Sequence, residues 1–246
     1  MQIEKLIWTE EKIKRFWDYE SKYPENYFSF QLGKTLTLRF LDILKKSRNV
    51  LDYGCGNGYL IKYLLETGVD VYGTDLSEES LNIVNLKYKG YSNFHGALSL
   101  KKLIASHKKF DLITLIEVFE HLSDDHLEET LKNIKLLLFK DEGVAIITTP
   151  NDEDLLKSNI YCPECSKTFH RWQHLRSWSK DSLTSYLASK DFKILEVFTT
   201  NFFNKPRKNN IDRIFYFFLE FIKFRILKKI PPPENKDPHL VCIFKV

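Results

Sequence analysis

Three glycines alternate with other residues in a short segment that begins at an aspartate. Gly54, Gly56 and Gly58 follow Asp52 where a short apolar run gives way to a helical pattern. Glycine lets the backbone approach a ligand closely, and a helix N-terminus supplies N–H donors. Asp75 ends the next apolar run, where a carboxylate can accept hydrogen bonds from ribose hydroxyls. The loop and the acid together predict a site for a nucleoside-containing cofactor; the alternative is a structural turn in another nucleotide-binding fold.

Two glutamates and a histidine follow a further apolar run. Glu117, Glu120 and His121 come directly after the strand predicted over 110–116, where open α/β sheets place their ligand crevice. The three side chains could hold a metal, or His121 could act as a general base near neutral pH. The alternative is that Glu117 and His121 only shape the cofactor pocket and cap the helix predicted over 124–139.

Two cysteines and two histidines have the spacing C-x2-C-x4-H-x3-H, formed by Cys162, Cys165, His170 and His174. Two thiolates and two imidazoles suit tetrahedral zinc. His174 also stands shortly before a predicted helix and could face the active site instead. We expect Cys162, Cys165 and His170 to bind zinc or another divalent metal, with His174 in the active site. The alternative is two free cysteines and surface histidines.

The elements that must position these residues are strands alternating with helices. Short apolar runs predict strands over 50–53, 69–74, 91–95, 110–116, 143–149, 193–199 and 239–246. Helical patterns lie between most of them, which indicates an α/β protein with a mostly parallel sheet and helices on both faces. Residues 150–178 show no regular pattern, and we expect them to be irregular. We predict three parts: a helical cap over 1–47, a central domain formed by 48–200 and 239–246, and an insertion over 201–238.

The chain has 246 residues, of which 43% are apolar and 28% charged, so disordered and low-complexity classes are excluded. No apolar run reaches the roughly 18 residues of a membrane span, and the charged N-terminus lacks a signal-peptide core, so we expect a cytoplasmic location. The net charge is +4, but 201–230 alone contains eight Lys and Arg against two acids. The helix predicted over 211–230 is basic and Phe-rich. It could lie on the cytoplasmic face of a membrane, or pack on the body as a lid or dimer contact.

The pattern D-x-G-x-G-x-G at 52–58, followed by the acid at position 75, resembles that of class I S-adenosylmethionine (SAM)-dependent methyltransferases. The resemblance implies a Rossmann-like, seven-stranded sheet whose last strand is antiparallel. It also implies that the three glycines wrap the methionine part of SAM and that Asp52 holds its amino group. By the same resemblance, Asp75 binds the ribose, and Leu76, Ala97 and Leu98 lie near the adenine.

The acid–histidine segment resembles one in ubiquinone-biosynthesis O-methyltransferases. It is also similar to one in small-RNA 3′-terminal 2′-O-methyltransferases, where acids and histidines bind a divalent metal. That second resemblance implies an alternative metal set of Glu117, Glu120, His121 and His174. The stretch from His174 to Ser179 resembles a segment before a helix in many small-molecule methyltransferases, which favours His174 in the active site.

We predict a SAM-dependent methyltransferase that moves a methyl group to an oxygen or nitrogen of a small-molecule, glycan or lipid-linked acceptor. His121 and His174 are the candidate bases that remove the acceptor's proton, with Glu117 beside them. An alternative is a metal-dependent RNA 3′-terminal 2′-O-methyltransferase, although the modest net charge argues against a nucleic-acid partner. A weaker alternative is a non-catalytic SAM-binding partner subunit.

Overall fold

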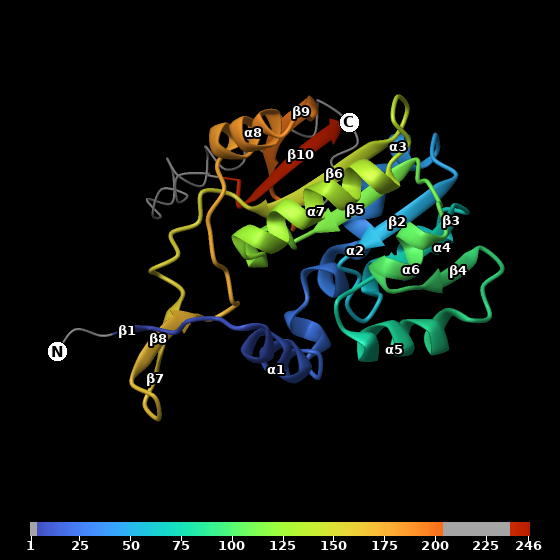
Figure 1. Cartoon of the computed structure of the whole chain (residues 1–246). Helices are drawn as coiled ribbons and strands as arrows, with labels where there is room; N and C mark the ends of the chain where they lie inside the picture. The colour runs from blue at the N-terminus through green and yellow to red at the C-terminus, as the bar shows by residue number, and fades with distance from the viewer. Residues whose placement is uncertain (1–3, 204–236) are drawn as a thin grey trace, which may run out of the picture.

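The computed structural model describes residues 4–203 and 237–246, and it contains two sheets with helices around the larger one (Figure 1). The strands are β1 (Glu4–Lys5), β2 (Asn49–Tyr53), β3 (Asp70–Thr74), β4 (Phe94–Ala97), β5 (Leu112–Ile116), β6 (Val144–Pro150), β7 (Asn159–Cys162), β8 (Lys167–His170), β9 (Lys193–Thr200) and β10 (His239–Lys245). The helices are α1 (Glu10–Glu20), α2 (Phe28–Arg39), α3 (Leu41–Leu44), α4 (Tyr59–Glu66), α5 (Glu78–Tyr88), α6 (Leu100–Ala105), α7 (Asp124–Leu137) and α8 (Lys180–Ser189). Two short 3-10 helices are η1 (Pro24–Asn26) and η2 (Phe119–His121).

The larger sheet has seven strands in the order β4-β3-β2-β5-β6-β10-β9. Neighbouring strands from β4 to β6 pair in parallel, whereas β10 pairs antiparallel with both β6 and β9. The predicted fold class, a Rossmann-like and mostly parallel seven-stranded sheet with an antiparallel last strand, is confirmed. This strand order brings the carboxyl ends of β2, β3, β5 and β6 to one edge of the sheet, where parallel sheets bind their ligands.

Alternate residues of the central strands pack into two hydrophobic cores. Val50, Leu112 and Ile146 join the core formed with α2 to α5, while the neighbouring Leu51 and Ile113 join the one formed with α6 to α8. A strand buried on both faces needs apolar side chains at successive positions, which explains the continuous apolar runs in the sequence. The sheet is therefore held rigidly on both faces, and its strand ends provide fixed positions for the site.

The N-terminal helices of the predicted cap cover part of this framework. Thr9 caps α1. The core that contains β2 and β3 also contains Leu32 and Leu36 of α2, Leu44 of α3, and Phe40 between these two helices. The domain boundaries remain a prediction. The insertion predicted over 201–238 and its helix over 211–230 lie almost entirely outside the described residues. Within the described ranges, no helix is long and apolar enough to cross a membrane.

The segment predicted to be irregular over 150–178 contains a β-hairpin instead. Its strands β7 and β8 pair antiparallel, and the N-terminal strand β1 adds to β8 in parallel beside the hairpin (Figure 1). The turn is closed by a hydrogen bond from the Ser166 N–H to the Cys162 carbonyl, with Ser166 at φ 56°. The prediction missed the hairpin because its four-residue strands lack regular alternation of apolar and polar residues. The strand predicted over 91–95 is also shifted, because β4 spans Phe94–Ala97.

Candidate functional site

The glycine loop and Asp75 come together where β2 and β3 end. Gly54, Gly56 and Gly58 have φ values of 77°, 49° and 74°, a region that L-residues with a side chain rarely adopt. One carboxylate oxygen of Asp75 accepts a hydrogen bond from the Gly56 N–H (2.8 Å), and the other accepts one from the Ser77 N–H (2.9 Å). The loop conformation and the position of the carboxylate are therefore fixed by each other.

The three glycines differ in what surrounds them. A Cβ added at Gly54 would lie 2.8 Å from the Val118 side chain, and one at Gly58 would lie 2.9 Å from Tyr88. At Gly56 the nearest contact among the described residues would be a ring carbon of Tyr27, at 3.6 Å. Gly54 and Gly58 are thus needed for packing of the loop, whereas Gly56 leaves its backbone accessible to a ligand.

Asp52 lies beneath this loop with only 3% of its surface exposed. Burial raises the pKa of its carboxyl to about 7, although a hydrogen bond from the Thr114 hydroxyl (3.0 Å) opposes the shift. The nearby negative charge of Asp75 raises the pKa further. No cationic side chain of residues 4–203 or 237–246 forms an ion pair with Asp52. A buried carboxylate of this kind favours a cationic ligand, and the ammonium group of SAM is one.

The residues predicted near an adenine flank the same strand ends. Leu76 directly follows Asp75 and is 79% exposed, which is unusual for a leucine and leaves an apolar surface for a ring to cover. The side-chain amide of Asn85 bonds both the N–H and the carbonyl of Ala97 (2.8 Å each), and the Leu98 N–H bonds the Gly73 carbonyl. The Asn85 bonds hold the end of β4 against α5, and the Leu98 bond holds it against β3. An apolar residue beside a fixed strand end fits the adenine part of a SAM molecule.

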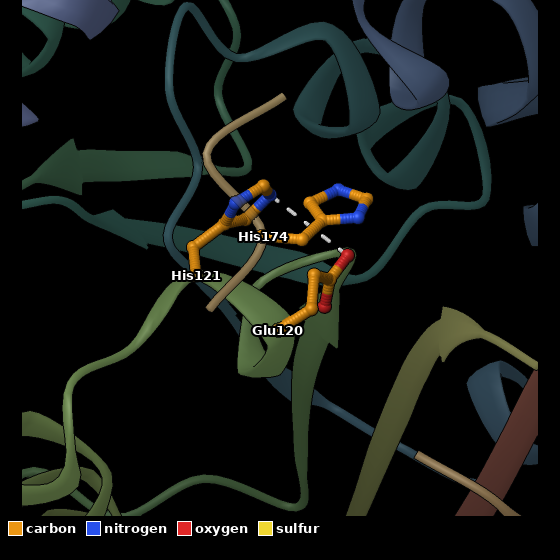
Figure 2. A group of neighbouring side chains, drawn as sticks. All are labelled: Glu120, His121 and His174. Carbon is orange, nitrogen blue, oxygen red and sulfur yellow. Dashed lines mark ion pairs between the residues drawn. The ribbon is translucent and has the colours of Figure 1, made fainter. Parts of the chain in front are cut away.

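A second group of polar side chains follows β5. Glu120, His121 and His174 each offer a ligand atom, and these atoms lie within 4.8 Å of one another (Figure 2). Glu120 is 1% exposed, and within the described residues its oxygens have no hydrogen-bond partner of good geometry. Its Oε1 does lie 3.8 Å from Nε2 of His121, the contact dashed in Figure 2. A buried carboxylate with so weak a partner is costly, so the site favours either a proton or a cation at this position.

The pKa shifts in this group also favour a proton or a cation at Glu120. Burial, and then the charge of Glu117, raise the pKa of Glu120 well above its usual range. Burial, and then His174, lower the pKa of His121 to about 3, so His121 is neutral near pH 7. A neutral imidazole is the form that binds a metal or accepts a proton. Of the predicted alternative metal set, the structure therefore brings three members together.

Glu117, the fourth member, is held differently. Its oxygen Oε1 accepts a hydrogen bond from the Thr148 hydroxyl (2.8 Å), and its own N–H bonds the Thr148 carbonyl (3.0 Å). Its backbone has φ 53°, an uncommon value outside glycine. Burial raises its pKa to about 7. Glu117 thus stands at the end of β5, bonded across to β6, and is not part of the group of three.

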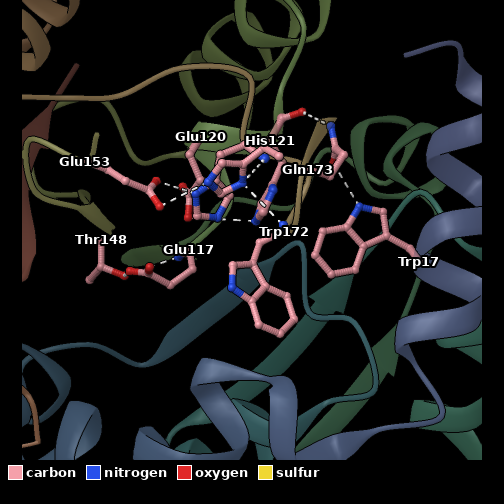
Figure 3. Close-up of polar contacts among 10 residues, drawn as sticks. Trp17, Glu117, Glu120, His121, Thr148, Glu153, Trp172 and Gln173 are labelled. Atoms are coloured by element: carbon pink, nitrogen blue, oxygen red, sulfur yellow. Dashed lines mark hydrogen bonds and ion pairs between the residues drawn. The ribbon is translucent and has the colours of Figure 1, made fainter. Parts of the chain in front are cut away.

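Glu153, which Figure 3 labels, and His170 extend the cluster beyond His174. Glu153, His170 and His174 also have ligand atoms within 4.8 Å of one another. Burial would raise the pKa of Glu153, but its hydrogen bond with His174 and the charges of both imidazoles lower it instead. Sequence reasoning missed Glu153; the one available signal was its position three residues after Pro150, the last residue of β6.

The two cysteines lie at the tip of the hairpin, away from His170. In the hairpin register Cys162 faces Lys167, whereas His170 faces Asn159 at the other end. Three residue pairs along a strand correspond to about 10 Å. Cys162 is partly buried and Cys165 is exposed, and among the described residues no group of three metal-ligating side chains includes either of them. The structure thus does not assemble the predicted set of Cys162, Cys165 and His170, because the extended strand β8 separates its members.

The N-terminal cap forms one wall of the cluster. The indole N–H of Trp17 donates to the side-chain oxygen of Gln173 (3.1 Å), and the amide nitrogen of Gln173 donates to the His121 carbonyl (3.1 Å). The Trp17 ring also meets the His121 ring edge-on, with centroids 4.9 Å apart (Figure 3). Gln173 is fully buried at φ 61°. No periodic pattern in the sequence indicates this link between Trp17 and Gln173, which are 156 positions apart.

The strand order, the glycine loop and the acid after β3 define the fold of class I SAM-dependent methyltransferases. The chain belongs to the methyltransferase-domain family, whose model matches residues 23–197. The resemblance predicted from the sequence is therefore confirmed at the level of the family.

Three known proteins illustrate what the chain is similar to. It is 33% identical over 116 residues to a ubiquinone biosynthesis O-methyltransferase from Bordetella avium, a match that covers 45% of this chain and 46% of that protein. The chain thus matches about half the length of this relative. A SAM-dependent methyltransferase from Clostridium acetobutylicum has a similar fold, with a TM-score of 0.60, 15% identity, and 95% and 98% of the two chains covered. The plantazolicin methyltransferase in complex with SAH has a TM-score of 0.54 at 18% identity, with coverage of 96% and 90%.

Proposed function

We propose that this chain is a SAM-dependent O-methyltransferase acting on a small molecule. The observation that carries the proposal is the contact between Asp75 and the Gly56 N–H, which joins the glycine loop to the acid after β3. The similarity to an O-methyltransferase of ubiquinone biosynthesis supports oxygen as the acceptor atom and a quinone precursor as the kind of substrate. An acceptor attached to a glycan or lipid is part of the same proposal. The alternative of an RNA acceptor has no such support, because similarity in fold does not indicate the substrate.

Each part of the site has a distinct role in this proposal. SAM supplies an electrophilic methyl group on a sulfonium centre. Asp75 accepts hydrogen bonds from the ribose hydroxyls, and Asp52 pairs with the amino group of SAM. The backbone at Gly56 allows SAM to approach closely. The edges of η2 and the loop around His174 then face the acceptor, which must be aligned with the methyl group. Where no ion is bound, His174 takes the acceptor's proton, whereas a pKa of about 3 makes the neighbouring His121 a poor base near neutral pH.

A divalent metal at Glu120, His121 and His174 is the second element of the proposal. Two imidazoles and one carboxylate suit zinc, manganese or iron. The unpaired oxygens of buried Glu120 fit a cation at this point. When bound, such an ion supplies positive charge that lowers the pKa of an acceptor hydroxyl. Glu120 would hold the ion, and the two neutral imidazoles would complete the set. With the ion bound, their lone pairs are used as ligands, so the ion takes over the activation of the acceptor hydroxyl from the histidine base.

The cofactor proposal is tested by calorimetric titration with SAM. Asp75→Ala should weaken binding by about 2–3 kcal/mol, or roughly 30- to 150-fold, because charge-assisted hydrogen bonds to the ribose are lost. Asp70→Ala is the matched control. Asp70 stands at the opposite end of strand β3 from the glycine loop, and its carboxylate contacts His95 instead. Equal SAM affinity of the Asp75→Ala variant and the wild type would refute the ribose role.

The acceptor and location are tested together. Transfer of a labelled methyl group from SAM into a cell extract, followed by phase partition, should place label in the small-molecule or lipid fraction. Label in RNA that disappears on chelation would overturn the acceptor proposal.

We also propose that the chain works in the cytoplasm with 211–230 at a membrane surface, supported by the basic and aromatic sequence. Removal of 205–230 should then abolish liposome binding; unchanged binding and activity would contradict it.

A further inference from the structure

His170, Glu153 and His174 form a chain of contacts that ends in the proposed active site. Nδ1 of His174 lies 2.5 Å from one carboxylate oxygen of Glu153. The other oxygen of Glu153 lies 3.2 Å from Nε2 of His170. On its far side, Nδ1 of His170 accepts backbone N–H groups of Trp172 (3.3 Å) and His174 (3.2 Å). The rings of His170 and His174 are stacked with centroids 4.4 Å apart.

These contacts determine where the protons sit. Nδ1 of His170 faces two N–H donors, so it must carry a lone pair, and the proton of the neutral ring is then on Nε2, the atom 3.2 Å from a Glu153 oxygen. An ionised carboxylate only accepts hydrogen bonds, so Glu153 requires a donor from His174 as well. The proton of His174 is therefore on Nδ1, and its lone pair is on Nε2.

We propose that Glu153, held by His170, is a positioning residue that fixes His174 in the Nδ1–H tautomer and so keeps its Nε2 free to accept a proton or bind a cation. The proposal rests on the proposed function, because it gives His174 its task in methyl transfer. It also separates the two groups of three: Glu120, His121 and His174 can hold an ion, whereas His170 contacts Glu153 through a protonated nitrogen. Histidines with such tasks commonly donate their other N–H to a carboxylate.

The direct test is nitrogen-15 NMR of the histidine rings in chelated protein, which reports the protonated nitrogen without requiring activity. Wild type should show His174 protonated on Nδ1 and His170 on Nε2. Glu153→Met keeps the chain length but removes the acceptor, and it should shift His174 toward the Nε2–H form. Glu153→Gln keeps one acceptor oxygen and should restore the wild-type tautomer. Asp154→Asn is the matched control, because Asp154 is exposed on the same loop.

A second measurement covers the case in which Glu153→Met does not fold. His170→Asn retains an acceptor for the two backbone N–H groups but loses the contact with Glu153. It should loosen Glu153 and give a mixture of His174 tautomers. Zinc affinity, measured by competition with a chelator, should fall about 10- to 100-fold in Glu153→Met and less in His170→Asn. With a turnover assay, kcat should fall while the KM for SAM stays unchanged.

The outcomes separate this proposal from the proposed function. A wild-type His174 protonated on Nε2, or an unchanged tautomer in both Glu153→Met and His170→Asn, would overturn the positioning role. Unchanged SAM affinity in Asp75→Ala would refute the cofactor role while leaving the tautomer result intact. A fall in SAM affinity in Glu153→Met equal to the fall in zinc affinity would indicate general damage and would also contradict the proposal.

Discussion

The cofactor loop and the acid–imidazole cluster lie at the same edge of the sheet but are built in different ways. The loop and Asp75 are joined by a hydrogen bond from the backbone N–H of Gly56 to the carboxylate 19 residues further on. The cluster combines side chains from η2, the segment after β6, the end of β8 and helix α1. A site made from backbone shape depends on local sequence, whereas a site made from side chains depends on how distant segments pack. Four predictions test this difference, in order of decreasing expected effect.

The loop should be intolerant of side chains at its helix end. Gly58→Val combines positive φ with a Cβ 2.9 Å from Tyr88, and should lower the free energy of unfolding by about 2–5 kcal/mol and abolish SAM binding. Gly68→Val is the matched control. Gly68 has φ 87°, but a Cβ added there would meet no atom of the described residues within 4 Å. It should cost only about 1–2 kcal/mol. Chemical denaturation measures both; equal losses would show that crowding at Gly58 is unimportant.

The cluster should depend on a cation. Zinc at about 100 times its dissociation constant should stabilise the chelated wild type by about 2.7 kcal/mol. Glu120→Gln should lose this gain but be no less stable than wild type in chelator, because it removes a buried carboxyl whose charged form is strongly disfavoured. Thermal unfolding with and without zinc is the measurement. Glu129→Gln on α7 is a surface control and should keep the full zinc response.

The link between the cap and the cluster should be specific. Gln173→Leu removes both hydrogen bonds of the buried amide and should lower the free energy of unfolding by about 1–3 kcal/mol. Combining it with Trp17→Phe, which lacks the donor, forms a double-mutant cycle. The two changes should be non-additive by about 0.5 kcal/mol or more, and strict additivity would show that the contact is not energetically coupled.

SAM binding should follow the ionisation of Asp52. Burial raises the pKa of this carboxyl to about 7, so affinity should rise by up to about tenfold between pH 6 and pH 8 as the charged form appears. Because the folded pKa exceeds the unfolded value, the contribution of Asp52 to folding stability falls as pH rises from about 4 to about 7. Asp52→Asn should bind SAM weakly at every pH and lack this part of the stability change. An identical pH profile of SAM affinity in wild type and Asp52→Asn would contradict the role of Asp52 in binding the amino group of SAM.

Much of the framework could be predicted because its signals are local. The continuous apolar runs of β5 and β6, the caps at Ser77, Ser123 and Ser179, and the glycine loop each act within a few residues. The hairpin of β7 and β8 was missed because short strands paired by tertiary contacts lack a periodic pattern. For the same reason the spacing of Cys162, Cys165 and His170 suggested one metal site, although the extended strand between them keeps the last residue apart.

The sequence alone determined the fold class, the family and the residues around the glycine loop, since strand burial and positive-φ turns are properties of short segments. Only the tertiary structure decided that Glu120, His121 and His174 converge, that His170 belongs with Glu153, and that Gln173 ties the cap to His121. Spacing along the chain does not determine which side chains meet across loops, because that depends on the path of the backbone between them. The packing of three separate loops at one sheet edge fixed those contacts.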